Sequence, residues 1–509
     1  MSLKRNILAN YASQIYVTLI GIVMVPMYLK YMGAEAYGLV GFFAMIQVWF
    51  GLLDMGLTLT LVRETSRLRV GAVDPLTYRH SVRALELIFI CVGIVGGALM
   101  FFNSASIGSS WLNVQQLDMA TVTTSLQLMA FAVAMRWMSG LYRGIVSGVE
   151  DFVWLGGFNA FIATWRFIGV IPLLVWLGGT PLVFFGFQFA LGLIELFVLF
   201  LKAGRLLPEL PNDKNFDWSL KIFFLSVRRT LTFSIGISFA ALVWVMMTQV
   251  DKLLLSKLLS LADYGIFTLS VLAASGVSLF AGPLSNALLP RLARLHAQGD
   301  EAGLILLYKK MTRAVVVIVV PISLLLALFS EKILFVWTGN LVVAVKGGFV
   351  LSLYALGNAV LAAAAFPYYL QYAKGELRLH LIGTGLFLLA FIPSLLLLTQ
   401  TYGVIGAGYA WLVANILYLL LWTPVVHKKF AKSQHWQWLV EDVVLPSRYS
   451  VFALLAFAVF MTKVDAWPIE RIPLAASLFV TACVGVGISL FSQREFRGLV
   501  NNWWILTKS

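Results

Sequence analysis

Runs of about 20 apolar residues recur along most of this 509-residue chain. A helix of that length crosses the roughly 30 Å hydrocarbon core of a bilayer. Inside that core, backbone hydrogen bonds must be satisfied within helices or closed barrels. Only 12% of the residues are charged, against about 25% in a typical soluble domain. The chain is therefore predicted to be an all-α polytopic membrane protein.

Fourteen segments are long and apolar enough to be predicted as membrane spans. The apolar stretch after Lys4 and Arg5 is longer than a signal-peptide core, so it is interpreted as a retained first span. The thirteenth span is short, and the tenth is expected to be tilted or broken near Pro367. The predicted spans lie near 9–29, 38–61, 83–102, 120–146, 152–177, 181–201, 230–250, 264–289, 314–336, 342–372, 379–399, 404–426, 449–462 and 472–491.

Lysine and arginine are distributed unequally between the two sides of these spans. With the N-terminus in the cytoplasm, 28 of the 37 are counted with the cytoplasmic loops and span ends and 7 with the opposite side, and the remaining two, Arg136 and Arg166, lie deeper within spans. Basic loops stay cytoplasmic. We therefore expect an inner-membrane protein with both termini in the cytoplasm. The net charge of +14 then needs no nucleic-acid partner.

The two halves of the chain resemble each other. Ala36-Tyr37-Gly38 recurs as Asp263-Tyr264-Gly265, at an offset of about 227 residues, and both copies lead into a basic loop. Parallel repeats of this kind place a binding site between two lobes; the alternative is a chance similarity of two apolar hairpins. The predicted domains are an N-terminal lobe at 1–202, a cytoplasmic linker with an amphipathic helix at 203–229, a C-terminal lobe at 230–426, and a region at 427–509 with spans 13 and 14.

Ionisable side chains inside the spans are concentrated in the first lobe. Such groups are costly in a bilayer, so they usually line a cavity or pair with one another. Arg136, Arg143 and Arg166 are candidates for binding an anionic substrate headgroup, because the guanidinium fork matches phosphate oxygens. The alternative is internal pairing, of Arg166 with Glu195 or of Arg136 with Asp54. Arg143 also fits an arginine that extends to the cytoplasmic surface.

Two carboxylates within spans, Asp54 and Glu195, are candidates for binding a coupling proton or cation. A structural hydrogen-bond acceptor is the equal alternative for Asp54. Asp251 and Lys252 fit an interfacial ion pair as well as a site. The secondary cavity candidates are Gln14, Gln47, Tyr354, Asn358, Asp251 and Lys252.

Several kinds of catalytic machinery are missing from the sequence. It has no Walker A loop, its five histidines show no metal-ligand spacing, and its two cysteines lie in apolar runs. No predicted outer loop exceeds about 20 residues, so a catalytic domain on that face has no place. We therefore predict a transporter and not an enzyme, without catalytic residues, metal or cofactor apart from H+ or Na+ as coupling ion.

Short stretches in both lobes resemble the Wzx-type polysaccharide flippases. This family belongs to the superfamily of multidrug extruders, lipid-linked oligosaccharide flippases and lipid II flippases. The resemblance covers nearly the whole chain. The matching stretches are Asn6–Tyr11, Val25–Gly38, Leu53–Leu57 and Val62–Glu64 in the first lobe, and Val250–Lys252, Tyr264–Gly265 and Pro290–Arg291 in the second.

The resemblance implies two six-helix lobes in a V, followed by two C-terminal helices that would offer a groove for a lipid tail. It implies transport of undecaprenyl-pyrophosphate-linked oligosaccharide repeat units, such as O-antigen units, from the cytoplasmic to the periplasmic leaflet. Alternating access driven by an ion gradient is the implied mechanism. Membrane lipids, and a polymerase and chain-length regulator of lipopolysaccharide synthesis, are the implied partners of a monomeric protein.

Three alternatives compete with this interpretation. Lipid II flippases tend to carry an Arg-Asp pair in span 1, which this sequence lacks. A cation-coupled extruder of small drugs would prefer twelve spans and an acidic cavity. A membrane polymerase or ligase of polysaccharide assembly usually carries a long periplasmic loop, which is missing here.

Overall fold

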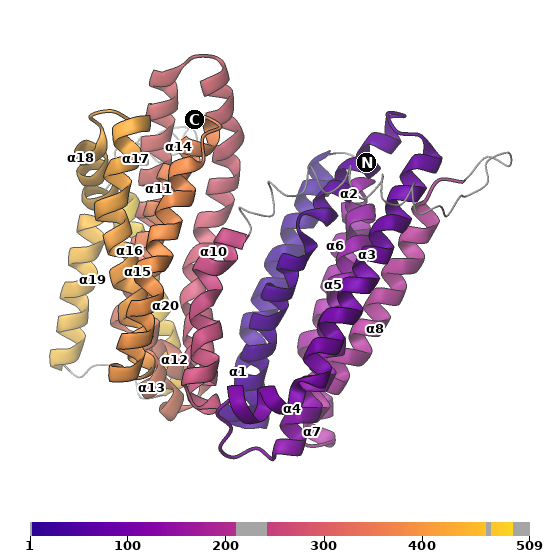
Figure 1. Cartoon of the computed structure of the whole chain (residues 1–509). Coiled ribbons are helices and arrows are strands. Elements are labelled where there is room, and N and C mark those ends of the chain that lie inside the picture. Colours follow the sequence, from indigo (N-terminus) through magenta and orange to yellow (C-terminus); the bar gives the residue numbers. More distant parts are fainter. Residues whose placement is uncertain (1–2, 210–241, 465–469, 492–509) are drawn as a thin grey trace, which may run out of the picture. The chain divides into compact units, whose positions relative to one another are not determined.

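The computed structural model of the chain describes residues 3–209, 242–464 and 470–491. Nearly all of these residues are helical, and ten of their helical segments are long and apolar enough to cross a membrane. The chain divides into two units, Met1–Gly265 and Ile266–Ser509. Each unit is a set of long helices that run alongside one another (Figure 1).

The first unit is built around α5 (Met119–Gly148), which packs against α3 (Pro75–Phe102) and α8 (Pro181–Leu206). Asp118 caps α5 by accepting a hydrogen bond from the Thr121 N–H at 3.1 Å, a side chain typical of that position. Residues 242–258 add a further helix to this unit. Its other helices are α1 (Leu3–Gly51), α2 (Leu57–Arg69), α3 (Pro75–Phe102), α4 (Ser104–Ser106), α6 (Phe152–Thr164), α7 (Val170–Trp176) and α8 (Pro181–Leu206), with the short turns η1 (Leu52–Asp54), η2 (Ile107–Trp111) and η3 (Trp165–Gly169).

Helix α1 joins the first two predicted spans through a kink at Gly33, whose φ of 84° is a conformation that glycine adopts at little cost. The second predicted span, 38–61, is not one unbroken helix. After η1 the backbone turns through Met55, with φ 45°, and Gly56, with φ 71°, before α2 begins. This break corrects the prediction of one continuous span, and it places Asp54 at the end of η1 instead of two turns inside an unbroken helix.

The repeated Tyr-Gly pairs meet inside the first unit. A Cβ on Gly38 would lie 2.1 Å from the Leu261 carbonyl oxygen, and one on Gly265 would lie 2.5 Å from the Ala34 carbonyl oxygen. Backbones can approach this closely only where a side chain is missing, as at small-residue helix contacts in membranes. The glycines of both repeat copies are therefore required for the same helix contact.

We expect Gly38→Val to destabilise the protein by about 1–3 kcal/mol or more, because the added side chain collides with backbone that cannot move aside. Thermal unfolding in detergent would measure the effect. The matched control is Gly186→Val in α8, where nothing lies within 4 Å of an added Cβ. Equal unfolding temperatures for the two variants would contradict the contact.

The second unit begins within α10 (Leu261–Ala297). Its helix α13 (Leu341–Ala364) packs against α11 (Glu301–Leu328) and α16 (Val404–Leu417). Two later helices, α19 (Leu445–Val464) and α20 (Arg471–Phe491), also pack against α11. The remaining helices are α11 (Glu301–Leu328), α12 (Ser330–Thr338), α14 (Phe366–Ala373), α15 (Arg378–Tyr402), α16 (Val404–Leu417), α17 (Thr423–Phe430), α18 (His435–Gln437), α19 (Leu445–Val464) and α20 (Arg471–Phe491), with the π-helical turns η4 (Tyr418–Trp422) and η5 (Trp438–Val444).

The number of predicted spans agrees with the structure. The ten membrane-length segments include Leu8–Asp54, which holds two predicted spans. Helices α5 and α10 correspond to the fourth and eighth predicted spans, and the helix at 242–258 overlaps the end of the seventh. The predicted break near Pro367 is confirmed, because α13 ends at Ala364 and α14 starts at Phe366. The protein is thus an all-α polytopic membrane protein of about fourteen spanning helices.

Two predictions fall largely on residues 210–241, outside the described part of the chain. They are the amphipathic helix of the linker at 203–229 and most of the seventh span at 230–250. The predicted domain limits stay a prediction.

Candidate functional site

Four intramembrane charges of the first unit come from three neighbouring segments. Arg136 and Arg143 lie seven residues apart on α5, so they share one face of that helix, about 10 Å apart along its axis. Arg166 belongs to the π-helical turn η3, and Glu195 belongs to α8. Because α5 and α8 pack along their lengths, residues far apart in the sequence meet here.

Glu195 is shared by two arginines. Arg143 Nη2 donates to its Oε1, and Arg166 Nη2 donates to its Oε2. The carboxylate is 3% exposed. Of the two roles weighed for Arg166, the structure therefore contains the ion pair with Glu195. The pairing of Arg143 with the same carboxylate was not predicted from the sequence.

Two amide side chains support this arginine pair. Arg143 Nη1 donates to Asn159 Oδ1 on α6, and Gln188 Nε2 donates to the Arg166 backbone carbonyl at 3.3 Å. Sequence reasoning missed both residues, although an amide inside an apolar span is a recognisable signal of a buried polar contact. We call Arg136, Arg143, Arg166 and Glu195 the arginine cluster.

The arginine cluster keeps a positive charge. Two guanidinium groups share one carboxylate, and Arg136 interacts electrostatically with all three of the other members. Within the described residues Arg136 makes no hydrogen bond and no ion pair, so the alternative pairing with Asp54 is not formed. An unpaired cation among apolar helices is costly, and it marks a place where an anion would be stabilised.

Arg136 faces a cavity of about 290 Å³. One wall of this cavity is formed by the end of α1, by η1 and by the start of α2. The opposite wall is formed by α5. Asp54 Oδ1 accepts hydrogen bonds from the Thr58 backbone N–H at 3.1 Å and from the Thr58 hydroxyl at 2.6 Å. The lining residues are Gln47, Phe50, Gly51, Asp54, Thr58, Val133, Arg136, Trp137 and Gly140. Three of the predicted site residues, Gln47, Asp54 and Arg136, thus share one cavity.

The other secondary candidates lie elsewhere. Gln14 is exposed on α1. Lys252 Nζ lies 3.1 Å from Asp251 Oδ1, and Asp251 is 1% exposed, so the ion pair weighed for these two residues is present. Their part in transport stays a prediction.

Tyr354 and Asn358 are packed between helices of the second unit. Asn358 Nδ2 donates to the Ala274 carbonyl at 3.0 Å, and its Oδ1 accepts from Trp411 Nε1 at 3.1 Å. Tyr354 is 2% exposed and stacks on Trp411 with ring centroids 5.7 Å apart. These contacts join α10, α13 and α16, and a role of the two residues in a cavity stays a prediction.

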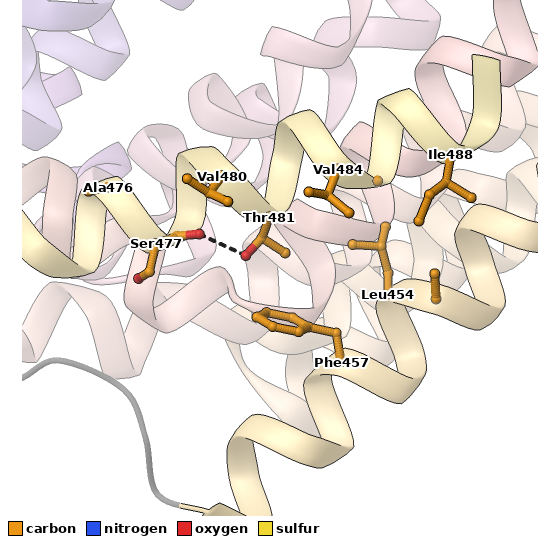
Figure 2. A pocket seen from close by; sticks show the side chains of 10 residues that line it. Leu454, Phe457, Ala476, Ser477, Val480, Thr481, Val484 and Ile488 are labelled. Atoms are coloured by element: carbon orange, nitrogen blue, oxygen red, sulfur yellow. Dashed lines mark hydrogen bonds between the residues drawn. The ribbon is translucent and has the colours of Figure 1, made fainter. Parts of the chain in front are cut away.

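An apolar groove of about 500 Å³ runs between α19 and α20. Figure 2 shows Leu454 and Phe457 of α19 facing Val480, Thr481 and Val484 of α20. The polar atoms there are bonded within their own helix, since the Thr481 hydroxyl donates to the Ser477 carbonyl at 2.7 Å and the Ser477 hydroxyl to the Leu474 carbonyl at 2.9 Å. The groove therefore presents hydrocarbon.

Comparison with known proteins identifies the family. A family model described as polysaccharide biosynthesis protein matches residues 3–296, which is more than half of the chain. The chain belongs to this family. The resemblance to the Wzx-type flippases that the sequence motifs indicated is thereby confirmed.

Individual relatives agree with this assignment. The chain is 18% identical to a protein of Shigella flexneri named "Putative O-antigen transporter", over 83% of this chain and 97% of that protein. Its fold matches that of the lipid II flippase MurJ in an inward closed conformation, with a TM-score of 0.74, 14% identity, and 96% and 99% of the two chains covered. An inward-facing multidrug resistance transporter of the MATE family and MOP superfamily matches with a TM-score of 0.65 and 15% identity, over 82% of this chain and 96% of that one. This member of the polysaccharide biosynthesis protein family thus shares the fold of these two transporters.

Proposed function

We propose that this protein flips undecaprenyl-pyrophosphate-linked oligosaccharide repeat units from the cytoplasmic to the periplasmic leaflet of the bacterial inner membrane. Transport proceeds by alternating access and uses an ion gradient. The polar headgroup needs such a carrier, because moving unshielded polar and charged groups through hydrocarbon is prohibitively costly.

The observation that carries the proposal is the net positive charge of the arginine cluster. Arg136 has no partner among the described residues, and Arg143 and Arg166 together have one carboxylate between them. Guanidinium groups bind phosphate oxygens through two parallel hydrogen bonds. A pyrophosphate headgroup supplies the negative charge that this cluster lacks.

The apolar groove between α19 and α20 is our proposed surface for the polyprenyl tail. Its lining is hydrocarbon and its polar atoms are bonded internally. A long prenyl chain gains contact with such a surface by van der Waals packing, without leaving an apolar environment. Headgroup and tail are then recognised by different chemistry in different helices.

Asp54 and Glu195 stay the proposed coupling carboxylates for H+ or Na+, and their surroundings favour Asp54. Both oxygens of Glu195 hold arginines, so a proton or cation there would have to displace two charge-assisted hydrogen bonds. Asp54 lines the cavity and makes no ion pair with a described residue.

The names of the relatives support a transporter and not an enzyme. They describe an O-antigen transporter, a lipid II flippase and a multidrug transporter. A polymerase or ligase of polysaccharide assembly, the rival from another class, has no support in these names. A polymerase and a chain-length regulator of the same pathway stay proposed partners of a monomeric flippase.

Transport by reconstituted protein tests this function. We expect Arg136→Ala and Arg166→Ala each to lower flipping of a labelled lipid-linked oligosaccharide about 10- to 100-fold, because a hydrogen bond to a charged group is worth about 1.5–3 kcal/mol. The control is Arg205→Ala, an exposed arginine in the last turn of α8. Unchanged flipping in both cluster variants, at equal protein levels, would rule out the headgroup assignment.

A further inference from the structure

We propose that the cavity lined by Gln47, Asp54 and Arg136 binds the sugar that is attached directly to the pyrophosphate. This inference rests on the proposed function and adds a specificity site to it. The arginine cluster recognises the phosphate groups common to all such substrates. The cavity beside Arg136 distinguishes one first sugar from another.

Hydrogen-bonding groups in this cavity are available to a ligand. The Gln47 side chain has no hydrogen bond to any described residue, and the Arg136 guanidinium has none either. Asp54 Oδ1 accepts from Thr58, but a carboxylate can accept about four hydrogen bonds, so acceptor capacity remains. The cavity is thus lined by both hydrogen-bond donors and acceptors. The hydroxyl and amide groups of a sugar require both kinds of partner.

The charges of the cavity favour a sugar phosphate over a simple ion. Arg136 attracts the phosphate group, and the Asp54 carboxylate accepts hydrogen bonds from hydroxyl groups. A sugar phosphate carries an anionic group for Arg136 and uncharged hydrogen-bond donors for Asp54. Its hydroxyl groups donate to Asp54 while its phosphate oxygens accept from Arg136.

An aromatic wall completes the cavity. Phe50 lies edge-on to Trp137, with ring centroids 5.9 Å apart. Gly96 of α3 leaves room for the Phe50 ring. A Cβ at position 96 would lie 2.4 Å from Phe50 Cζ, so a larger residue would displace the ring. Trp137 is buried and stacks on Phe89, with ring centroids 4.2 Å apart, so it is Phe50 that gives the apolar face of a sugar a packing surface. The volume of about 290 Å³ is at the small end of ligand pockets, which fits one sugar ring.

Binding measurements with purified protein test the site. The probes are polyprenyl pyrophosphate without a sugar and the same lipid carrying one glucose or one N-acetylglucosamine. We expect the wild-type protein to bind at least one sugar-bearing probe about tenfold or more tightly than the sugar-free probe, and to prefer one sugar. Gln47→Leu should lose most of that preference and keep its affinity for the sugar-free probe.

The matched control is Gln400→Leu, an exposed glutamine on α15, which should behave as wild type. Equal affinities of the wild-type protein for all three probes would overturn the sugar site, as would an unchanged preference in Gln47→Leu. The proposed function fails by a different result, namely wild-type binding of the sugar-free pyrophosphate no tighter than binding of the polyprenyl alcohol. The two failures are therefore distinguishable.

Discussion

Replacing Glu195 with alanine is expected to abolish flipping and to destabilise the protein by about 3–5 kcal/mol, the usual cost of removing one partner from a buried ion pair. Glu195 is 3% exposed and holds Arg143 and Arg166 at once. Its loss would leave two guanidinium groups facing each other in the membrane interior. Thermal unfolding and transport, measured on the same preparation, would report both effects.

The control for this variant is Glu376→Ala. Glu376 also pairs with a cation, Lys429, but it is 44% exposed, and exposed pairs contribute less than about 1 kcal/mol. A Glu195→Ala protein as stable as Glu376→Ala would refute the buried arrangement. A further variant, Glu195→Ala with Arg166→Met, should regain stability without regaining transport, because it removes one unpaired charge but also one headgroup contact.

Filling the groove between α19 and α20 should prevent transport of long-tailed substrates. We expect Gly485→Phe to lower flipping about tenfold or more, since losing only about 1.4 kcal/mol of tail binding weakens affinity tenfold. Gly485 lines the groove, and its added Cβ would already lie 3.1 Å from Leu454 Cδ2. A bulky ring there occupies the space of the prenyl chain.

Tail length separates this effect from misfolding. A substrate with a tail of two or three prenyl units should be carried equally well by Gly485→Phe and the wild type. The control Gly487→Phe, two residues along α20, has nothing within 4 Å of an added Cβ and does not line the groove. If both variants transport the long-tailed substrate at the wild-type rate, the groove does not bind the tail.

The spans were predictable because a membrane imposes one length and one composition on every helix that crosses it. The break between α13 and α14 was predictable too, since Pro367 cannot continue a helix without loss of a hydrogen bond. The break after Asp54 was not, because it depends on a left-handed backbone at Met55, a residue type that rarely adopts that conformation. Local residue type therefore predicted the helices better than the turns between them.

For the candidate site, the sequence predicted which charges lie inside the membrane but not how they pair. The pairing of Arg143 with Glu195 joins residues 52 positions apart through the packing of α5 on α8. Residue spacing within one helix does not predict a contact between two different helices. The unpaired state of Arg136 is also a property of the packed helices, since the sequence left its pairing with Asp54 open as an alternative.

The most direct test of the account is whether the arginine cluster binds a pyrophosphate headgroup. Binding of undecaprenyl pyrophosphate and of undecaprenol, which has the same tail without charge, should be compared in the wild-type protein and in Arg136→Ala. We predict that the wild-type protein prefers the pyrophosphate by about tenfold or more, and that Arg136→Ala loses most of this preference while keeping its affinity for undecaprenol. Equal binding of both lipids by the wild-type protein would contradict the account.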